Sequence, residues 1–221
     1  MRNYLKKGCP INGVDSMFVL IGAGGHAKVV VDILKESSKQ ILGFIDDNIE
    51  IREHNGIPSL GDITEIPSIL TKYKNLKFII TIGSNEVRQE IYKKLKIFDI
   101  NYGNAIHPSA IISSNTVIGT GTVVMANAVI NSSTIIGGHA IVNTASVIEH
   151  DCIVGEFTHI SPNSTLTGNV KIGKGTQIGA GATVIPNISI GEWSIIGAGS
   201  TVIRNLPSRM IAVGSPAKII S

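Results

Sequence analysis

The chain has 221 residues, of which 43% are hydrophobic and 16% are charged, and its formal net charge is +3. This length fits one large domain or two small ones. The weak positive charge, without basic clusters interleaved with aromatic residues, argues against nucleic-acid binding. No apolar run reaches the roughly 18 residues of a membrane span, and residues 1–10 lack the apolar region of a secretory signal. Cys9 and Cys152 show no pairing signature, so we expect a cytoplasmic protein.

Residues 1–16 have no clear periodicity, and we interpret them as an extension. After them, short apolar runs alternate with amphipathic segments and glycine-containing turns. Alternating strands and helices of this kind are typical of a small parallel α/β fold, so we expect a Rossmann-like half-domain over residues 17–105. Its strands and helices are predicted over residues 17–21, 28–37, 41–45, 78–82 and 86–96.

A glycine turn directly follows the first predicted strand. Gly22, Gly24 and Ala27 match the G-x-G-x-x-A pattern of dinucleotide-binding turns, and Asp46 or Asp47 falls about where an acid would contact the ribose. The pattern is weak on its own, and the domain is only about half the size of a full dinucleotide-binding fold. It favours a nucleotide-type ligand held by glycine amides and a helix N-terminus. A bare tight turn and NAD chemistry are the alternatives.

From residue 106 onward the chain repeats with a period of six. Every sixth residue from Ile106 to Val202 is Ile, Val or Leu, the residue four places later is usually small, and glycine often follows the aliphatic side chain. A hexapeptide repeat predicts a parallel β-helix in which three repeats close one triangular coil. We expect this domain over residues 106–207, with residues 208–221 as a C-terminal tail. In the first coils the residue before each aliphatic is also apolar although it faces outward, which predicts cover by a partner chain or by the α/β domain.

Four histidines fall within the repeat, and we interpret His107, which opens it, as a surface residue. His139 occupies a corner position, His150 lies next to a corner in Glu149-His150-Asp151, and His159 has an outward position in the following repeat. An outward histidine is most often a solvated surface residue, but two of them close together beside a carboxylate favour a functional role. A zinc-dependent carbonic anhydrase of the γ class would need a histidine pair about five residues apart. The spacings from 139 to 150 and from 150 to 159 do not fit that pattern.

The segments carrying these features, taken together, resemble the bacterial sugar acyltransferases of the sialic acid O-acetyltransferase group. Within this group they are most similar to the UDP-amino-sugar N-acetyltransferases that make di-N-acetylated bacillosamine. The resemblance extends over residues 17–218. The segments that carry it are residues 22–27, 46–47, 83–86, 142–170 and 213–218.

The resemblance implies a left-handed β-helix that assembles as a homotrimer, with acetyl-CoA in the groove between neighbouring prisms and no metal. It implies an acetyl-CoA-dependent N-acetyltransferase acting on a UDP-linked 4-amino-4,6-dideoxy sugar, in surface glycan or glycoprotein sugar biosynthesis. The alternative is a sialic acid or other sugar O-acetyltransferase. A non-enzymatic nucleotide-binding trimer is a further alternative.

Residue roles follow from the same resemblance. The general base falls on His150 and its acidic neighbour on Asp151, where similar proteins often carry the longer Glu. Acetyl-CoA contacts fall on His159, Ala180 and Gly168. The nucleotide-sugar positions fall on Gly24, Gly25, His26, Asp46, Asp47, Gly83 and Asn143. An imidazole can accept a proton from an amine near neutral pH, and an adjacent carboxylate stabilises the imidazolium that forms.

Overall fold

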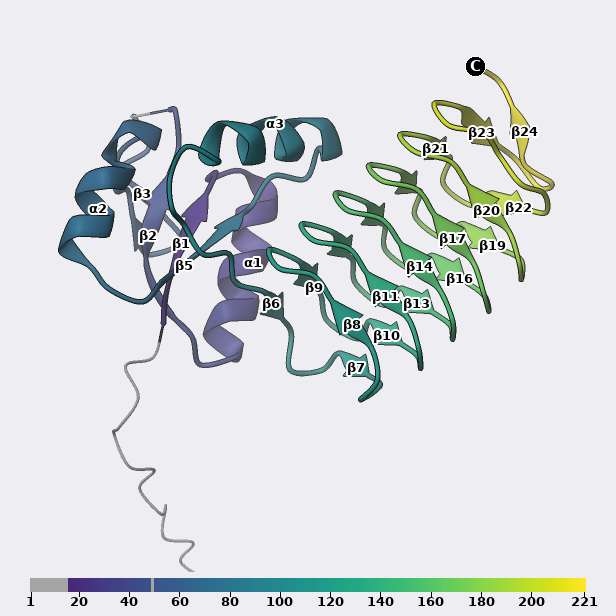
Figure 1. Cartoon of the computed structure of the whole chain (residues 1–221), viewed down its shortest axis with the longest axis horizontal. Helices are drawn as coiled ribbons and strands as arrows, with labels where there is room; N and C mark the ends of the chain where they lie inside the picture. The colour runs from purple at the N-terminus through teal and green to yellow at the C-terminus, as the bar shows by residue number, and fades with distance from the viewer. Residues whose placement is uncertain (1–15, 49) are drawn as a thin grey trace, which may run out of the picture.

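The computed structural model describes residues 16–48 and 50–221. An α/β region lies beside one end of a long coiled prism (Figure 1). The α/β region holds a three-stranded parallel sheet in the order β2-β1-β5, formed by β1 (Met17–Ile21), β2 (Gln40–Ile45) and β5 (Leu76–Ile80). The predicted strand–turn–helix order is confirmed there.

The helices cover the sheet because each has one apolar side. α1 (Gly25–Glu36) buries Val30, Val31, Ile33 and Leu34, and α3 (Asn85–Leu95) begins where the Ser84 side chain accepts a hydrogen bond from the Val87 amide. Ser84 is therefore the N-cap of α3. The remaining elements of this region are β3 (Glu53–His54), β4 (Ile57–Pro58), the 3₁₀ turn η1 (Ile63–Glu65) and α2 (Ile66–Lys72).

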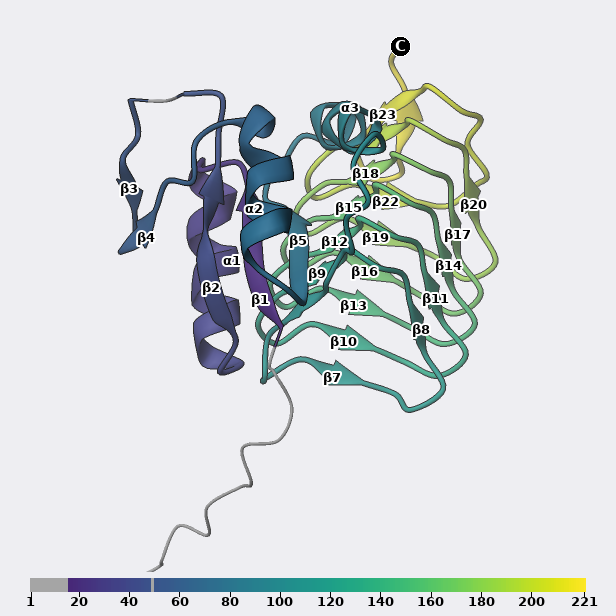
Figure 2. The ribbon, with the colours of Figure 1, turned by 60° about the vertical axis from the view of Figure 1, so that its left-hand side comes forward.

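The prism is a left-handed parallel β-helix made of two-residue strands joined by corners (Figure 2). We call its sides the first face (β6, β9, β12, β15, β18, β21), the second face (β7, β10, β13, β16, β19, β22) and the third face (β8, β11, β14, β17, β20). The strands are β6 (Ala105–Ile106), β7 (Ile111–Ile112), β8 (Val117–Ile118), β9 (Val123–Val124), β10 (Val129–Ile130), β11 (Ile135–Ile136), β12 (Ile141–Val142), β13 (Val147–Ile148), β14 (Ile153–Val154), β15 (His159–Ile160), β16 (Thr165–Leu166), β17 (Lys171–Ile172), β18 (Gln177–Ile178), β19 (Thr183–Val184), β20 (Ser189–Ile190), β21 (Ile195–Ile196) and β22 (Thr201–Val202).

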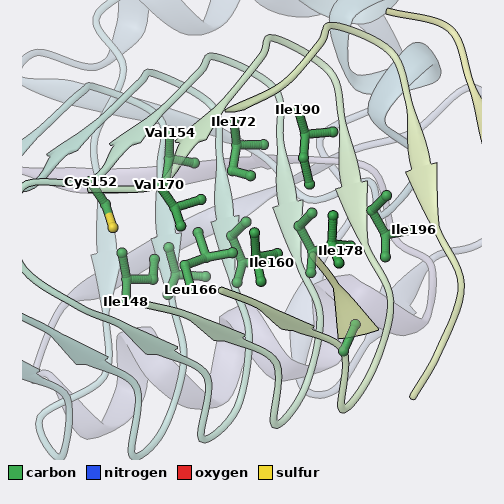
Figure 3. Packing of buried hydrophobic residues seen from close by; sticks show 14 of the residues in the cluster. Ile148, Cys152, Val154, Ile160, Leu166, Val170, Ile172, Ile178, Ile190 and Ile196 are labelled. Atoms are coloured by element: carbon green, nitrogen blue, oxygen red, sulfur yellow. The ribbon is translucent and has the colours of Figure 1, made fainter. Parts of the chain in front are cut away.

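The predicted aliphatic column fills the prism (Figure 3). Ile148, Ile160, Leu166 and Ile178 are fully buried, each in register with its counterparts in the coils above and below. From Thr122 onward the small residues four places after each aliphatic, such as Cys152, are buried as well. Cys152 is therefore a core residue.

Glycine follows the aliphatic residue because the coils stack closely. A Cβ on Gly137 would lie 2.5 Å from the backbone nitrogen of Glu156, and one on Gly155 would lie 2.6 Å from that of Lys174. The left-handed backbone conformation occurs two residues later in the corner, at positions such as His139 (φ 56°) and Phe157 (φ 57°). Close approach of the next coil, and not the turn itself, explains these glycines.

The outward apolar residues of the first coils divide into two sets. Val123 and Ile141 on the first face are 1% exposed, because they join the hydrophobic cluster of β1 and α1. On the third face the equivalent residues stay exposed: Val117 (59%), Ile135 (47%) and Ile153 (44%). On the second face Ile111 is 65% exposed, whereas Val129 and Val147 are half-buried. The predicted cover by the α/β domain is thus confirmed for the first face alone.

The last coil is closed by two short strands. β23 (Ile211–Val213) pairs in parallel with β21, and β24 (Lys218–Ile219) turns back antiparallel to β23. Among the helices of residues 16–48 and 50–221, none is long and apolar enough to cross a membrane.

Candidate functional site

His150 and Asp151 form a pair at the corner between the second and third faces. Nδ1 of His150 lies 2.7 Å from Oδ2 of Asp151 in the same chain, and the two side chains are 60% and 59% exposed. An ionised carboxylate can only accept, so the neutral ring carries its proton on Nδ1 and presents the Nε2 lone pair to solvent. The shorter Asp therefore reaches the imidazole, and the pair has the geometry of a general base with its polarising carboxylate.

Gly168 makes room for this imidazole. It occupies the same corner in the next coil, and a Cβ at this position would lie 2.8 Å from Cε1 of His150. The ring therefore rests against the Gly168 backbone. Gly168 entered the sequence analysis as an acetyl-CoA contact, and the structure shows that it also seats His150.

His159 lies on the first face, where β15 presents it outward toward the α/β region. Its Nε2 is 2.9 Å from Nδ2 of Asn143 in the preceding coil. Burial lowers the pKa of His159 to about 4, with the Arg88 charge acting in the same direction and contact with the Gly83 backbone opposing it. The ring is therefore neutral near pH 7 and accepts the amide hydrogen of Asn143 through Nε2.

His26 lies in the first turn of α1, close to His159. Burial lowers its pKa to about 4, and the charges of Arg88 and His159 add to that shift. Its Nε2 is buried and finds no hydrogen-bond partner within the part of the chain that the structure describes. A buried polar atom without a partner is costly, so this nitrogen is free to bind a ligand group.

Three glycines near His26 face open space. A Cβ placed on Gly24, Gly25 or Gly83 would meet no described atom within 4 Å, and none of the three has a positive φ. Neither backbone conformation nor internal crowding explains them. Bare backbone at these positions lets a ligand approach the amides of the α1 N-terminus closely.

The two aspartates after β2 have different surroundings. The Asp46 carboxylate accepts from the backbone amides of Ala23 (2.7 Å) and Asn48 (2.9 Å), so it already braces the glycine turn. Asp47 is exposed at the rim of a cavity of about 190 Å³ at the carboxyl edge of the sheet. The cavity is lined by Ile21, Gly22, Ile45, Asp46, Asp47, Ile63, Ile82, Val87 and Ile91.

The candidate residues form separate groups within one chain. His26, Gly83, Asn143 and His159 come together where the α/β region meets the first face. His150 and Gly168 lie at the corner between the other two faces, which in a triangular prism is opposite the first face. Ala180 lies between β18 and β19, at the corner of the first and second faces. One chain therefore does not bring its predicted base to its own nucleotide-sugar residues.

His139 and Arg88 have roles in the structure that the sequence did not indicate. His139 is 5% exposed and stacks on Phe157 with ring centroids 5.1 Å apart, so it is part of the junction between the two regions. Arg88 is 1% exposed and reaches the same corner. The sequence analysis missed Arg88, although a cation in the first turns of a helix opposes the helix dipole and was a usable signal.

No group of three or more His, Cys, Asp or Glu side chains within residues 16–48 and 50–221 could hold a metal ion. Of the titratable side chains described above, His150 and Asp151 pair with each other, His159 pairs with Asn143, and Asp46 accepts from backbone amides. The arrangement suits proton transfer and binding by hydrogen bonds.

Comparison with known proteins identifies the family. Residues 17–95 match the family model of the PglD N-terminal domain, and residues 169–204 match that of the bacterial transferase hexapeptide repeat. The crystal structure of PerB from Caulobacter crescentus, in complex with CoA and GDP-perosamine, superimposes with a TM-score of 0.88 at 38% identity, covering 95% of this chain and 99% of that one. The chain belongs to the hexapeptide-repeat sugar N-acetyltransferases.

Two other sugar N-acetyltransferases are similar to this chain, one over nearly its whole length and one over about half of it. The acetyltransferase domain of PglB from Neisseria gonorrhoeae, in complex with acetyl coenzyme A, has a TM-score of 0.86 at 31% identity and covers 93% of this chain and 100% of that one. UDP-N-acetylbacillosamine N-acetyltransferase from Bacillus subtilis is 40% identical over 107 residues, which are 48% of this chain and 50% of that protein. The chain thus spans half or less of the length of the curated relatives it matches.

Proposed function

We propose that this protein transfers the acetyl group of acetyl-CoA to the amino group of a nucleotide-linked amino sugar, with a UDP-linked 4-amino-4,6-dideoxy sugar as the expected acceptor. The observation that carries the proposal is the exposed His150 imidazole, fixed through Nδ1 by Asp151 and open at Nε2. Relatives of this chain have been solved with CoA, acetyl coenzyme A and GDP-perosamine. We place the reaction in the cytoplasm, as a step in the biosynthesis of nucleotide-linked sugars for surface glycans or glycoproteins.

In the proposed mechanism the neutral amine attacks the thioester carbonyl directly. His150 Nε2 takes the proton that the nitrogen loses as the C–N bond forms, and Asp151 stabilises the imidazolium. The tetrahedral intermediate then collapses, the C–S bond breaks, and the imidazolium returns the proton to the departing CoA sulfur. Chain residues supply only base, acid and hydrogen bonds, so no covalent acyl-enzyme is required.

We assign the acceptor to the α/β side. Gly24, Gly25 and Gly83 offer bare backbone for the diphosphate and sugar, His26 offers its unpaired Nε2, and Asp47 lies at the cavity rim. Asp46 then acts mainly by holding the turn. His159, Gly168 and Ala180 are assigned to acetyl-CoA, and Asn143 to holding His159 and contacting the acceptor.

The assembly that we propose is a homotrimer with sites between subunits. Val117, Ile135 and Ile153 form an exposed apolar stripe on the third face, one of the two faces that meet at the His150 corner, and Ile111 is exposed on the other. Such a stripe is typical of a surface that is buried in an assembly. A neighbour packed there would bring its own first face and glycine turn to His150, which joins the two groups that a single chain keeps apart.

The test is turnover of a panel of UDP- and GDP-linked amino sugars, UDP-hexoses and sialic acid with acetyl-CoA, with the acetylated product detected by mass. We expect an N-acetylated UDP-amino sugar. His150→Ala should lower kcat by about 10²–10⁴-fold, the usual worth of a general base, with acetyl-CoA affinity nearly unchanged. His159→Ala should impair acetyl-CoA use as well as the chemistry. A folded His150→Ala protein with full turnover on the native acceptor would end this mechanism.

A further inference from the structure

Arg88 is a buried cation that binds only carbonyl oxygens. It is 1% exposed, and within residues 16–48 and 50–221 no carboxylate lies within ion-pair distance of it. Its guanidinium nitrogens donate to the backbone oxygens of His139 (2.8 Å), Ile82 (2.9 Å), Gly83 (3.1 Å), Ser84 (3.4 Å), Phe157 (2.9 Å) and Thr158 (3.1 Å) and to Oδ1 of Asn85 (2.8 Å).

A charge buried without a counter-ion is unfavourable unless its hydrogen bonds are complete. Burial accordingly lowers the pKa of Arg88 to about 10, and Glu86 opposes that shift, so the group stays charged near neutral pH. Lysine has three donors and no planar fork, so it could not reach the same set of oxygens. The planar shape of the guanidinium, in addition to its charge, is what this site uses.

The oxygens bound by Arg88 come from two places that matter for the proposed reaction. One is loop 82–84 after β5, whose Gly83 faces the open space beside His26. The other is the corner between the third and first faces, where Phe157 and Thr158 directly precede His159. Asn85 extends this contact to the next coil by donating to the Gly175 oxygen (3.1 Å). One side chain thus links the acceptor loop to the strand that carries His159.

We infer that Arg88 is a positioning residue, which fixes loop 82–84 against the turn before His159 and so sets the geometry of the nucleotide-sugar site. This inference rests on the proposed function for its kinetic consequences but not for its structural ones. A displacement of about 1 Å at a reacting centre can cost 10²-fold in rate, so a loop that carries Gly83 needs such an anchor.

The charge of Arg88 has a second effect on the same site. The titratable groups that sense it are His26 on α1, His159 on β15 and His139 at the corner, and in each the pKa is lowered mainly by burial and further by Arg88. Glu156 opposes the shift at His139, and Glu86 is the acidic neighbour of Arg88 itself. Arg88 therefore helps to keep the two site histidines neutral.

The test compares Arg88→Lys and Arg88→Met with the native protein. Arg88→Lys keeps the charge and loses the fork, so we expect kcat/KM for the nucleotide sugar to fall by about 10–100-fold, while His26 and His159 still titrate near pH 4 by NMR. Arg88→Met loses the charge and the fork, so the midpoints of His26 and His159 should rise, while burial still keeps them below 6.5. In both variants the amides of loop 82–84 should exchange hydrogen faster than in the native protein.

Glu36→Gln is the matched control. It weakens the contact between Glu36 on α1 and His107 in the prism (2.9 Å), which joins the same two regions away from the site. We expect native kcat/KM and native loop exchange. Equal losses in Glu36→Gln and Arg88→Lys, or native constants in Arg88→Lys, would overturn the inference. If the native protein acetylates no nucleotide sugar, the proposed function fails, and the substrate-free NMR and exchange measurements still decide the role of Arg88.

Discussion

At the scale of single residues, three histidines in this protein are kept neutral by the same cause. Burial lowers the pKa of His26, His139 and His159 to about 4 from an ordinary value of 6.5, with Arg88 as a shared second cause. His150 lies in different surroundings, because its side chain is 60% exposed and lies beside a carboxylate. Environment, and not residue type, separates His150, which we propose as the base, from these buried rings.

These lowered pKa values predict an acid-sensitive fold. Between pH 6.5 and 4 the unfolded chain binds protons at these histidines that the native state does not, so stability is present above pH 6.5 and falls as the pH approaches 4. The slope should reach about 1.4 kcal/mol per pH unit for each histidine. Urea unfolding at a series of pH values measures it.

His139→Phe provides the comparison. Phe157 holds the equivalent corner position with the same positive φ, so phenylalanine fits this backbone. Nδ1 of His139 is buried without a partner in the described structure, so the substitution leaves no lost hydrogen bond there. We expect a folded protein in which the slope of unfolding free energy against pH is smaller by the contribution of one histidine. An unchanged slope would show that His139 titrates normally.

At the scale of elements, the aliphatic column was predictable because each six-residue repeat contains one strand and one corner. Every inward aliphatic from Val124 to Val202 that the period marked is buried. The amphipathic runs also predicted α1 and α3 to within a few residues. The β3–β4 hairpin and α2 were missed, because two-residue strands and a seven-residue helix carry too little periodicity to detect.

Two glycines at different corners of the prism should respond differently to alanine. Gly137→Ala places a Cβ 2.5 Å from the Glu156 nitrogen, so the coils must separate, and we expect a loss of at least about 1–3 kcal/mol. Gly168→Ala meets only the His150 ring, which can swing away. Its thermal midpoint should stay near native while kcat falls. Thermal unfolding and turnover are measured for both variants. A stability loss in Gly168→Ala together with native stability in Gly137→Ala would contradict these roles.

At the scale of the whole molecule, the sequence could suggest candidate site residues but not the face of the prism on which each lies. The repeat fixes inward and outward positions, yet the side of the prism that binds the α/β region depends on long-range contacts such as those of Arg88 with Phe157 and Thr158. His150 and His159 are only nine residues apart in the sequence, yet they lie on opposite sides of the prism. The exposed apolar stripe around Ile135 is the observation behind the proposed assembly with a second chain.

A complementation experiment tests the shared site. If His150 comes from one subunit and His159 from the next, neither His150→Ala nor His159→Ala trimers contain an intact site. After unfolding and refolding a 1:1 mixture, a site is intact when its first chain keeps His150 and its neighbour keeps His159. For random assembly that chance is about ½ × ½, so we expect about a quarter of native activity.

The matched control mixes His150→Ala with Asp151→Ala. These two residues contact each other within one chain at 2.7 Å, so every site in such a mixture has one lesion and the activity should stay at the mean of the two parents. Recovery in the first mixture but not in the second would assign His150 and Asp151 to one subunit and His159 to its neighbour. Mixed trimers should be verified by mass. If they form and the first mixture shows no recovery, the shared site is wrong. A single chain could then bring His150 and His159 together only by rearrangement of the coil, because they lie on opposite sides of the prism.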